Sequence, residues 1–308
     1  KNDNKPHAKR ELEMVVPELN NDLKQQLANV RAKRNFNVDE WIDKKTDLFN
    51  EYMTKCGLKA CVVNLSGGVD SAATLGLMLA AKQKPNSPIQ KVLGVAQPIH
   101  STASIWKRAL ECGEKMGAEV IVVDQTPIFD ALSTLVEQSV GIDGKDFSRG
   151  QLKSYMRTPV GYYVAQLLSQ QGLGCVVLGT GNKDEDGYLY YFCKAGDGIA
   201  DVQLINDLHK SEVFTVAGAL GVPDSILHAA PSADLWNGQT DEDELGFSYD
   251  FVELYTEFLE LSKEDQEKFI QNLTEEGLEQ FRELEAKAVA VHIRNSHKDD
   301  YPYNINIL

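Results

Sequence analysis

The sequence predicts an α/β fold, in which a doubly wound parallel sheet is flanked by helices and followed by a helical C-terminal extension. Short, continuously apolar segments alternate with longer amphipathic segments, as expected for strands that crossover helices cover on both faces. Glycines and small polar residues follow two of the apolar segments, and sheets of this kind bind ligands beyond the carboxyl ends of their strands.

The elements follow one another in a regular order. Residues 37–56 have apolar residues at helical spacing, and an apolar strand at 59–65 leads through a glycine-rich turn into a helix at 70–84. The same order then repeats. We expect strands at 91–99, 118–124 and 174–181, helices at 101–116, 127–138 and 157–171, and a loop at 141–150.

Both ends of the chain differ in composition from its middle. Residues 1–36 are polar and of mixed charge, which predicts a loosely held arm, and 301–308 form a short tail, so that 37–300 make up one domain. A polar and aromatic stretch at 231–251 predicts a long, lid-like loop. The acidic residues that follow, over 250–290, have helical spacing and predict helices with a solvated face.

Composition excludes several classes of protein. A formal net charge of -15 argues against a general nucleic-acid binder, which needs a basic stripe. No apolar run approaches the roughly 20 residues that cross a bilayer, so we expect no membrane association. The five cysteines include no CxxC pair, which predicts reduced, structural thiols in a cytoplasmic protein.

The segment SGGVDS, Ser66–Ser71, predicts an anion site between a strand and a helix. Gly67 and Gly68 allow a tight turn that brings bare N–H groups against a ligand, and the helix adds its positive N-terminal end. Phosphate is the natural guest, with hydroxyl donors at both ends of the segment. Asp70 cannot bind phosphate directly, so it either caps the helix or holds a metal ion; a plain capped turn is the alternative.

This segment is neither a Walker A loop nor a GxGxxG fingerprint. It resembles the pyrophosphate loop of the N-type ATP pyrophosphatases, which cleave ATP to AMP and pyrophosphate while they adenylate a substrate. Four further segments resemble, in order and spacing, the ammonia-dependent NAD synthetase family, and the resemblance covers about residues 37–300. They are GTGNKDE at 179–185, the stretches 194–214 and 231–250, and HK at 297–298. The resemblance implies an adenine-nucleotide alpha-hydrolase-like (Rossmann-like) sheet.

The resemblance also implies the following site. ATP would be bound by Ser66, Gly67, Gly68, Val69, Asp70, Ser71, Thr180, Lys210 and Ser232. Asp70 and Glu185 would hold Mg²⁺. Deamido-NAD would be bound by Arg157, Lys194, Asp197, Asp201, His297 and Lys298. Asp70, Lys210 and Asp201 are the expected catalytic residues.

The reaction implied is the last step of NAD biosynthesis. The nicotinate carboxylate of deamido-NAD attacks the α-phosphorus of ATP, and ammonia then displaces AMP from the NAD-adenylate to form the amide of NAD. Only about 36 residues precede Asn37, too few for an amidase domain, so we expect free ammonia as the direct donor unless a separate subunit delivers it. The family also implies a homodimer, to which Phe49 and Tyr52 could contribute.

Two positions depart from the family pattern. Tyr155 stands where the first arginine of an arginine-x-arginine pair is usual, which leaves Arg157 alone, and Ala96 stands where an arginine is usual two residues before Pro98. The segment between Glu185 and Lys194 is one residue longer than in the bacterial pattern.

Each site residue has an ordinary alternative. Glu185 and Asp197 could be plain surface carboxylates. Lys210 could be a solvated lysine paired with a nearby acidic residue. His297 could lie in a frayed tail. For the whole chain, the alternatives are another ATP pyrophosphatase, such as a GMP synthetase core or a tRNA-thiolating enzyme, or a non-catalytic adenine-nucleotide-binding module.

Overall fold

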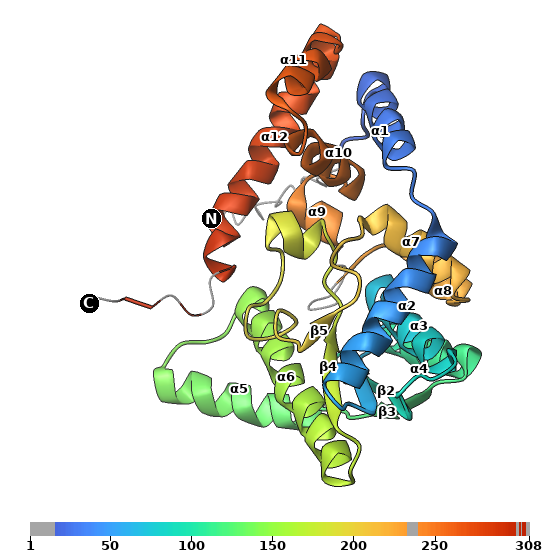
Figure 1. Ribbon diagram of the computed structural model, residues 1–308. Helices are drawn as coiled ribbons and strands as arrows, with labels where there is room; N and C mark the ends of the chain where they lie inside the picture. Colours follow the sequence, from blue (N-terminus) through green and yellow to red (C-terminus); the bar gives the residue numbers. More distant parts are fainter. Residues whose placement is uncertain (1–15, 233–239, 300–301, 303, 306–308) are drawn as a thin grey trace, which may run out of the picture.

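The fold was analysed in a computed structural model that describes residues 16–232, 240–299, 302 and 304–305 (Figure 1). In these residues five parallel strands form one sheet, in the order β3-β2-β1-β4-β5. The strands are β1 (Ala60–Asn64), β2 (Lys91–Ala96), β3 (Glu119–Val122), β4 (Cys175–Gly179) and β5 (Val202–Gln203). The predicted parallel sheet is confirmed. Its order reverses between β1 and β4, where a crevice for ligands is expected.

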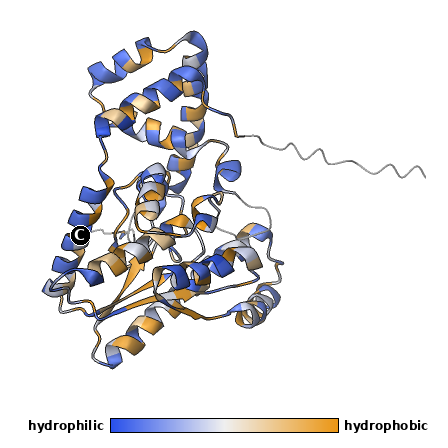
Figure 2. Cartoon of the chain, turned by 90° about the vertical axis from the view of Figure 1, so that its right-hand side faces the viewer, coloured by the Kyte–Doolittle hydropathy of each residue, from blue (hydrophilic) through white to orange (hydrophobic). Residues whose placement is uncertain are grey.

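Helices cover both faces of the sheet. One face carries α2 (Val38–Lys55), α3 (Val69–Gln83), α4 (Ala103–Met116) and α7 (Lys210–Ala219), and the other carries α5 (Thr126–Val140) and α6 (Asp146–Gln170). Strand residues alternate between the two cores, as the pleat requires: Cys61 and Val63 pack towards α3, and Val62 packs towards α6. In Figure 2 the strands are the most continuously hydrophobic segments.

The loop predicted for 141–150 is wrong in its second half, because α6 already begins at Asp146. The backbone N–H of Lys145 donates to Ser148 Oγ at 2.9 Å, which caps the first turn. Arg149, in that turn, forms a two-pronged ion pair with Glu137 of α5, at 2.9 and 2.7 Å. These contacts hold the turn in place.

A second core lies among the C-terminal helices. These are α9 (Asp241–Leu245), α10 (Tyr249–Leu259), α11 (Lys263–Gln271) and α12 (Glu275–Asn295), with the short turn η2 (Ser296–Lys298) after them. Phe251 and Phe281 are fully buried at the centre of this core. The predicted lid loop has its middle, 233–239, outside the described residues, and α9 and α10 occupy its last part.

The prediction of a loosely held arm is wrong for its second half. Residues 21–34 form α1 (Asn21–Arg34), which contacts α10 and α12. Leu19, Leu23 and Leu27 recur every four residues and are buried in the second core. Residues 1–15 lie outside the described part of the chain.

As expected for mostly structural thiols, all five cysteines are free, and Cys61, Cys112 and Cys193 are buried, whereas Cys56 is exposed. Burial raises the pKa of the Cys112 thiol to about 11, so this side chain stays protonated and packs as an apolar group. Within the described residues, no helix combines the length and the apolar character needed to cross a membrane.

Candidate active site

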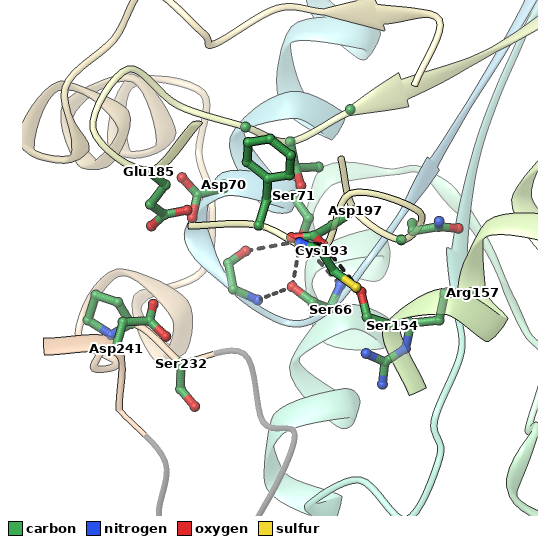
Figure 3. A pocket seen from close by; sticks show the side chains of 18 of the residues that line it. Ser66, Asp70, Ser71, Ser154, Arg157, Glu185, Cys193, Asp197, Ser232 and Asp241 are labelled. Carbon is green, nitrogen blue, oxygen red and sulfur yellow. Dashed lines mark hydrogen bonds between the residues drawn. The ribbon is translucent and has the colours of Figure 1, made fainter. Parts of the chain in front are cut away.

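A cavity of about 770 Å³ opens beyond the carboxyl ends of β1, β2 and β4, at the point where the strand order reverses (Figure 3). Most of the residues predicted for the site line it: Ser66, Gly67, Gly68, Val69, Asp70, Ser71, Arg157, Thr180, Glu185, Asp197, Lys210, Ser232, His297 and Lys298. Segments far apart in the sequence therefore meet in one place.

The SGGVDS segment forms the tight turn that its glycines predict. Gly67 has a φ of +88°, and a Cβ built on it would lie 2.2 Å from the carbonyl oxygen of Ile105 on α4. Inside the turn, Ser66 Oγ accepts a bond from the N–H of Gly68 at 3.2 Å, and Ser71 Oγ donates to the Gly68 carbonyl at 3.2 Å. The turn leads directly into α3, whose first N–H groups have no side-chain cap.

Lys210 lies at the centre of the charged part of the cavity. Its ammonium contacts Asp70 Oδ2 at 2.5 Å and Glu185 Oε1 at 2.7 Å, and its side chain is only 5% exposed. Burial alone would lower the pKa of Lys210, but the two carboxylate charges outweigh burial and hold the pKa above its ordinary value. The solvated-lysine alternative is wrong, and so is helix capping by Asp70.

A buried amide holds these carboxylates in position. Asn182, fully buried, donates from Nδ2 to Asp70 Oδ1 at 2.9 Å, while its Oδ1 accepts the N–H groups of Asp184 at 3.0 Å and Glu185 at 2.9 Å. The same side chain thus orients the acidic residues from α3 and from the segment after β4. Sequence analysis missed this role, although Asn182 lies within the GTGNKDE segment that it singled out.

A second buried group fixes the start of α7. The His209 ring lies between Asp184 Oδ1 at 2.7 Å and Glu257 Oε1 at 2.8 Å, and Asp184 Oδ2 accepts the N–H of Lys210 at 2.8 Å. Burial would lower the pKa of His209, but the two carboxylates raise it to about 9. His209 is therefore protonated at neutral pH and anchors the backbone of Lys210.

The buried ion group of His209, Asp184 and Glu257 predicts that the protein loses stability at alkaline pH. The pKa of His209 rises from 6.5 to about 9 on folding, so its contribution is complete below pH 6.5 and disappears as the pH passes 9. We expect the free energy of unfolding of the wild type to fall by on the order of 3 kcal/mol across this range. Urea titrations of wild type, His209→Gln and the exposed control His228→Gln between pH 6 and 10 measure it. An equally steep fall in His209→Gln would contradict the assignment.

Asp241 is a third carboxylate that sequence analysis did not single out. Only 6% of it is exposed, Oδ2 accepts the Tyr249 hydroxyl at 3.2 Å, and Oδ1 has no partner in the described residues. Burial, together with the charge of Glu185, raises the pKa of Asp241 to about 7. In Figure 3, Asp241 and Ser232 lie across the cavity from Arg157. Three carboxylates around one ammonium are an oxygen-rich, acidic donor set, which suits a hard cation.

The far end of the cavity is closed by the C-terminal segment. Lys298 donates from Nζ to the carbonyl of Phe192 at 2.7 Å and to that of Tyr190 at 3.2 Å, and His297 beside it lines the cavity. Asp197 accepts bonds from the N–H of Cys193 at 2.8 Å and from Ser154 Oγ at 3.2 Å. His297 thus belongs to the cavity wall rather than to a frayed tail.

Some predicted residues are placed elsewhere. Asp201 does not line the cavity: its Oδ2 accepts the N–H of Val177 at 2.8 Å and its Oδ1 the hydroxyl of Tyr162, so it fastens β4 to the chain before β5. Lys194 also lies off the cavity and donates to the His297 carbonyl at 3.4 Å. Phe49 is only 3% exposed in the core and cannot reach a partner subunit.

The two departures from the family pattern have ordinary surroundings. Ala96 is fully buried at the end of β2 and belongs to the core, and Tyr155 on α6 is 43% exposed. Neither side chain lines the cavity. Any cation that an arginine would have supplied from β2 must come from another element.

Comparison with known proteins gives one consistent result. The family model described as NAD synthase matches residues 41–302. A curated relative, the NH(3)-dependent NAD(+) synthetase of Methanosarcina acetivorans, is 34% identical over 86% of this chain and 94% of its own length, and that of Methanococcoides burtonii is 39% identical over 67% and 74%. Among solved structures, an NMN synthetase from Francisella tularensis is 27% identical with a TM-score of 0.71, covering 88% of this chain and 100% of its own. The chain belongs to the NAD synthase family.

Proposed function

We propose that the chain amidates the nicotinate carboxylate of deamido-NAD with free ammonia, at the expense of ATP. The observation that carries this proposal is the joining of the SGGVDS turn, Lys210 and two carboxylates in one cavity. An amine cannot displace oxide from a carboxylate, so the oxygen must first be converted into a leaving group. Adenylation with loss of pyrophosphate does this, and AMP then leaves when ammonia attacks the carbonyl carbon.

In this proposal the two ends of the cavity have different roles. The turn of Ser66–Ser71 and the start of α3 hold the polyphosphate through N–H and hydroxyl groups. Lys210, whose side chain is only 5% exposed, offsets the negative charge that develops on the departing pyrophosphate. Arg157, Asp197, His297 and Lys298 line the other part of the cavity, where the nicotinate nucleotide would lie, so that the protein acts mainly by positioning the reactants.

The direct test measures pyrophosphate release from ATP and Mg²⁺, with and without deamido-NAD, and with ammonium or glutamine as donor. We expect release that requires deamido-NAD, and NAD that forms from ammonium far better than from glutamine. Release that responds to xanthosine monophosphate instead would identify a GMP synthetase core. ATP binding without release in the presence of any acceptor would leave a nucleotide-binding module.

A second acceptor is favoured by one comparison. The structure from Francisella tularensis with a TM-score of 0.71 is an NMN synthetase, and this chain covers 100% of it. The corresponding acceptor here is nicotinate mononucleotide, which carries the same carboxylate without the AMP half. The ratio of kcat/KM for the two acceptors, measured in the same assay, decides between them.

We also propose that Asp70 and Glu185 hold magnesium, with Asp241 close by. Their oxygens are of the type that Mg²⁺ prefers, and Asp241 Oδ1 is a buried oxygen without a partner in the described residues. Magnesium bound there would neutralise charge on the polyphosphate. Among the described residues no group of three or more His, Cys, Asp or Glu side chains could hold a metal ion, so phosphate oxygens of ATP would have to complete the ligands.

The magnesium requirement predicts a shifted titration. Asp70→Asn and Glu185→Gln should each raise the Mg²⁺ concentration at half-maximal activity about 10-fold, because each removes one charged ligand. The control Glu260→Gln changes an exposed carboxylate that pairs with Lys183 and should not shift the titration. An unchanged magnesium dependence in both site variants would exclude these ligands.

Finally, we propose that the chain forms a homodimer through α5 and α6. Five large apolar residues line one side of α5 at helical spacing and are exposed: Ile128, Leu132, Leu135, Val136 and Val140. Phe147 and Tyr163 of α6 are also exposed, at 63% and 65%, and α6 packs on α5 at the edge of the molecule (Figure 1). An apolar surface of this kind marks a protein interface, and a second copy can cover it by two-fold symmetry.

Leu135→Glu should therefore convert the dimer to a monomer. Leu135 is 64% exposed, and a charge there would be buried against the partner. Light scattering should give about twice the 34.2 kDa chain mass for the wild type and the single-chain mass for the variant. Leu48→Glu, which alters a residue 60% exposed on α2, is the control and should stay dimeric.

A further inference from the structure

One wall of the cavity is formed by α4, which sequence analysis did not connect with the site. Its residues Ile105, Trp106 and Arg108 line the cavity together with the SGGVDS turn. The contact is close, because the Ile105 carbonyl lies where a side chain on Gly67 would be. Helices α4 and α7 both pack against α3, whose first turn follows the phosphate loop. Groups on α4 and on α7 can therefore approach the same ligand from two elements.

Arg108 has unused hydrogen-bonding capacity in this wall. Its Nη1 donates to the Ser225 carbonyl at 3.3 Å, and its Nε is buried and has no acceptor within the described residues. Among the described residues no carboxylate lies within 4.0 Å of the Arg108 guanidinium, whereas Arg34 and Arg149 do form ion pairs. This is unusual in a protein with a formal net charge of -15. A buried donor without a partner costs about 1–3 kcal/mol, so the present contacts do not satisfy this guanidinium.

We propose that Arg108 binds the polyphosphate of ATP, as a second cation beside Lys210. Arginine forms two parallel bonds to phosphate oxygens, and the Ser225 carbonyl holds one edge of the guanidinium so that another is left for the ligand. At the end of β2 and directly after it, the lining residues are Val95, Gln97 and Pro98, which bring no positive charge to this end of the cavity. Lys210 already shares its charge between two carboxylates, so a polyphosphate needs a further cation.

This inference rests on the proposed function in one respect, namely that ATP is the ligand. A bond that Arg108 makes equally to bound ATP and to the transition state lowers KM for ATP and leaves kcat almost unchanged. It should not affect the nicotinate acceptor, which lies near Arg157 and the C-terminal segment. These expectations separate a binding arginine from one that only supports the fold.

The test compares Arg108→Gln, Arg108→Lys and the neighbouring exposed control Lys107→Gln. Arg108→Gln should raise KM for ATP about 10- to 100-fold, with KM for the acceptor and kcat within about threefold of wild type. Arg108→Lys keeps the charge but cannot form two parallel bonds to phosphate, so its KM for ATP should lie between those of the wild type and Arg108→Gln. Lys107→Gln should have the KM for ATP of the wild type. A KM for ATP within twofold of wild type in Arg108→Gln, or an equal rise for both substrates, overturns the proposal.

A second readout keeps this test independent of the reaction. Titration of each variant with ATP alone, followed by intrinsic fluorescence, reports binding without an acceptor. If the wild type binds ATP but forms no NAD, the proposed function fails, while the difference between Arg108→Gln and Lys107→Gln still decides the role of Arg108. Equal affinities in these two variants would exclude phosphate binding by Arg108 whatever the reaction is.

Discussion

Lys210→Met is expected to lower kcat about 1,000-fold, the largest effect of any single change in the cavity. The ammonium is the only cation that contacts both Asp70 and Glu185 among the described residues. Methionine is unbranched and only one atom shorter than lysine, so the substitution removes the charge with little change in packing. The two buried carboxylates then lose the ammonium that lies between them, and the departing pyrophosphate loses one of the cations that offset its charge.

Single-turnover measurement of AMP formation from deamido-NAD, ATP and ammonium tests this expectation. Lys183→Met is the control, because Lys183 is 20% exposed and also pairs with a carboxylate, Glu257 at 2.8 Å, but does not line the cavity. The control should keep AMP formation within about threefold of wild type. A loss in Lys210→Met no larger than that in the control would show that Lys210 only stabilises the fold.

Gly67→Ala is expected to abolish ATP binding and to destabilise the protein by at least about 2 kcal/mol. The backbone at Gly67 has a φ of +88°, and its Cβ would lie 2.2 Å from the Ile105 carbonyl, a backbone atom that cannot turn aside. Either the loop or α4 must shift, and both form walls of the phosphate site.

Gly57→Ala provides the comparison for this variant. Gly57 also has a positive φ, +68°, but nothing lies within 4 Å of its Cβ, so alanine there meets only the conformational cost of about 1 kcal/mol. Urea denaturation measures the two stabilities, and ATP titration measures binding. Normal ATP affinity in Gly67→Ala would show that the loop does not need its present shape.

The sheet and its phosphate turn could be predicted from the sequence because their signals are local. Continuous apolar segments such as Val62–Val63 in β1 reflect burial on both faces, and two consecutive glycines between a strand and a helix indicate a tight turn. The part of α6 before Arg157 was missed because the glycines around 141–144 suggest a loop, whereas a cap at Lys145 and an ion pair to α5 decide where the helix begins. Such contacts depend on partners that are distant in the chain.

The charged interior of the site was harder to foresee for the same reason. The nearest acidic neighbours of Lys210 in the sequence are Asp207 and Glu212, which instead pair with Lys45 and Arg34. The true partners, Asp70 and Glu185, come from other elements, and His209 is charged only because the fold places Asp184 and Glu257 on either side of it. Asp201 shows the reverse case: a residue of the expected type at the expected position fastens a strand instead.

Helix α1 ties the start of the chain to its end, and this has a consequence for how the protein is made. Arg34 contacts Glu257, the partner of His209, across 223 residues, and Asp22 accepts the N–H of Thr274 across 252. A ribosome needs on the order of ten seconds or more to synthesise that interval. The nascent chain can therefore complete its parallel sheet and phosphate turn well before the ion pairs that support Lys210 exist. The supports of Lys210 therefore form only after α1 and the C-terminal helices have packed together.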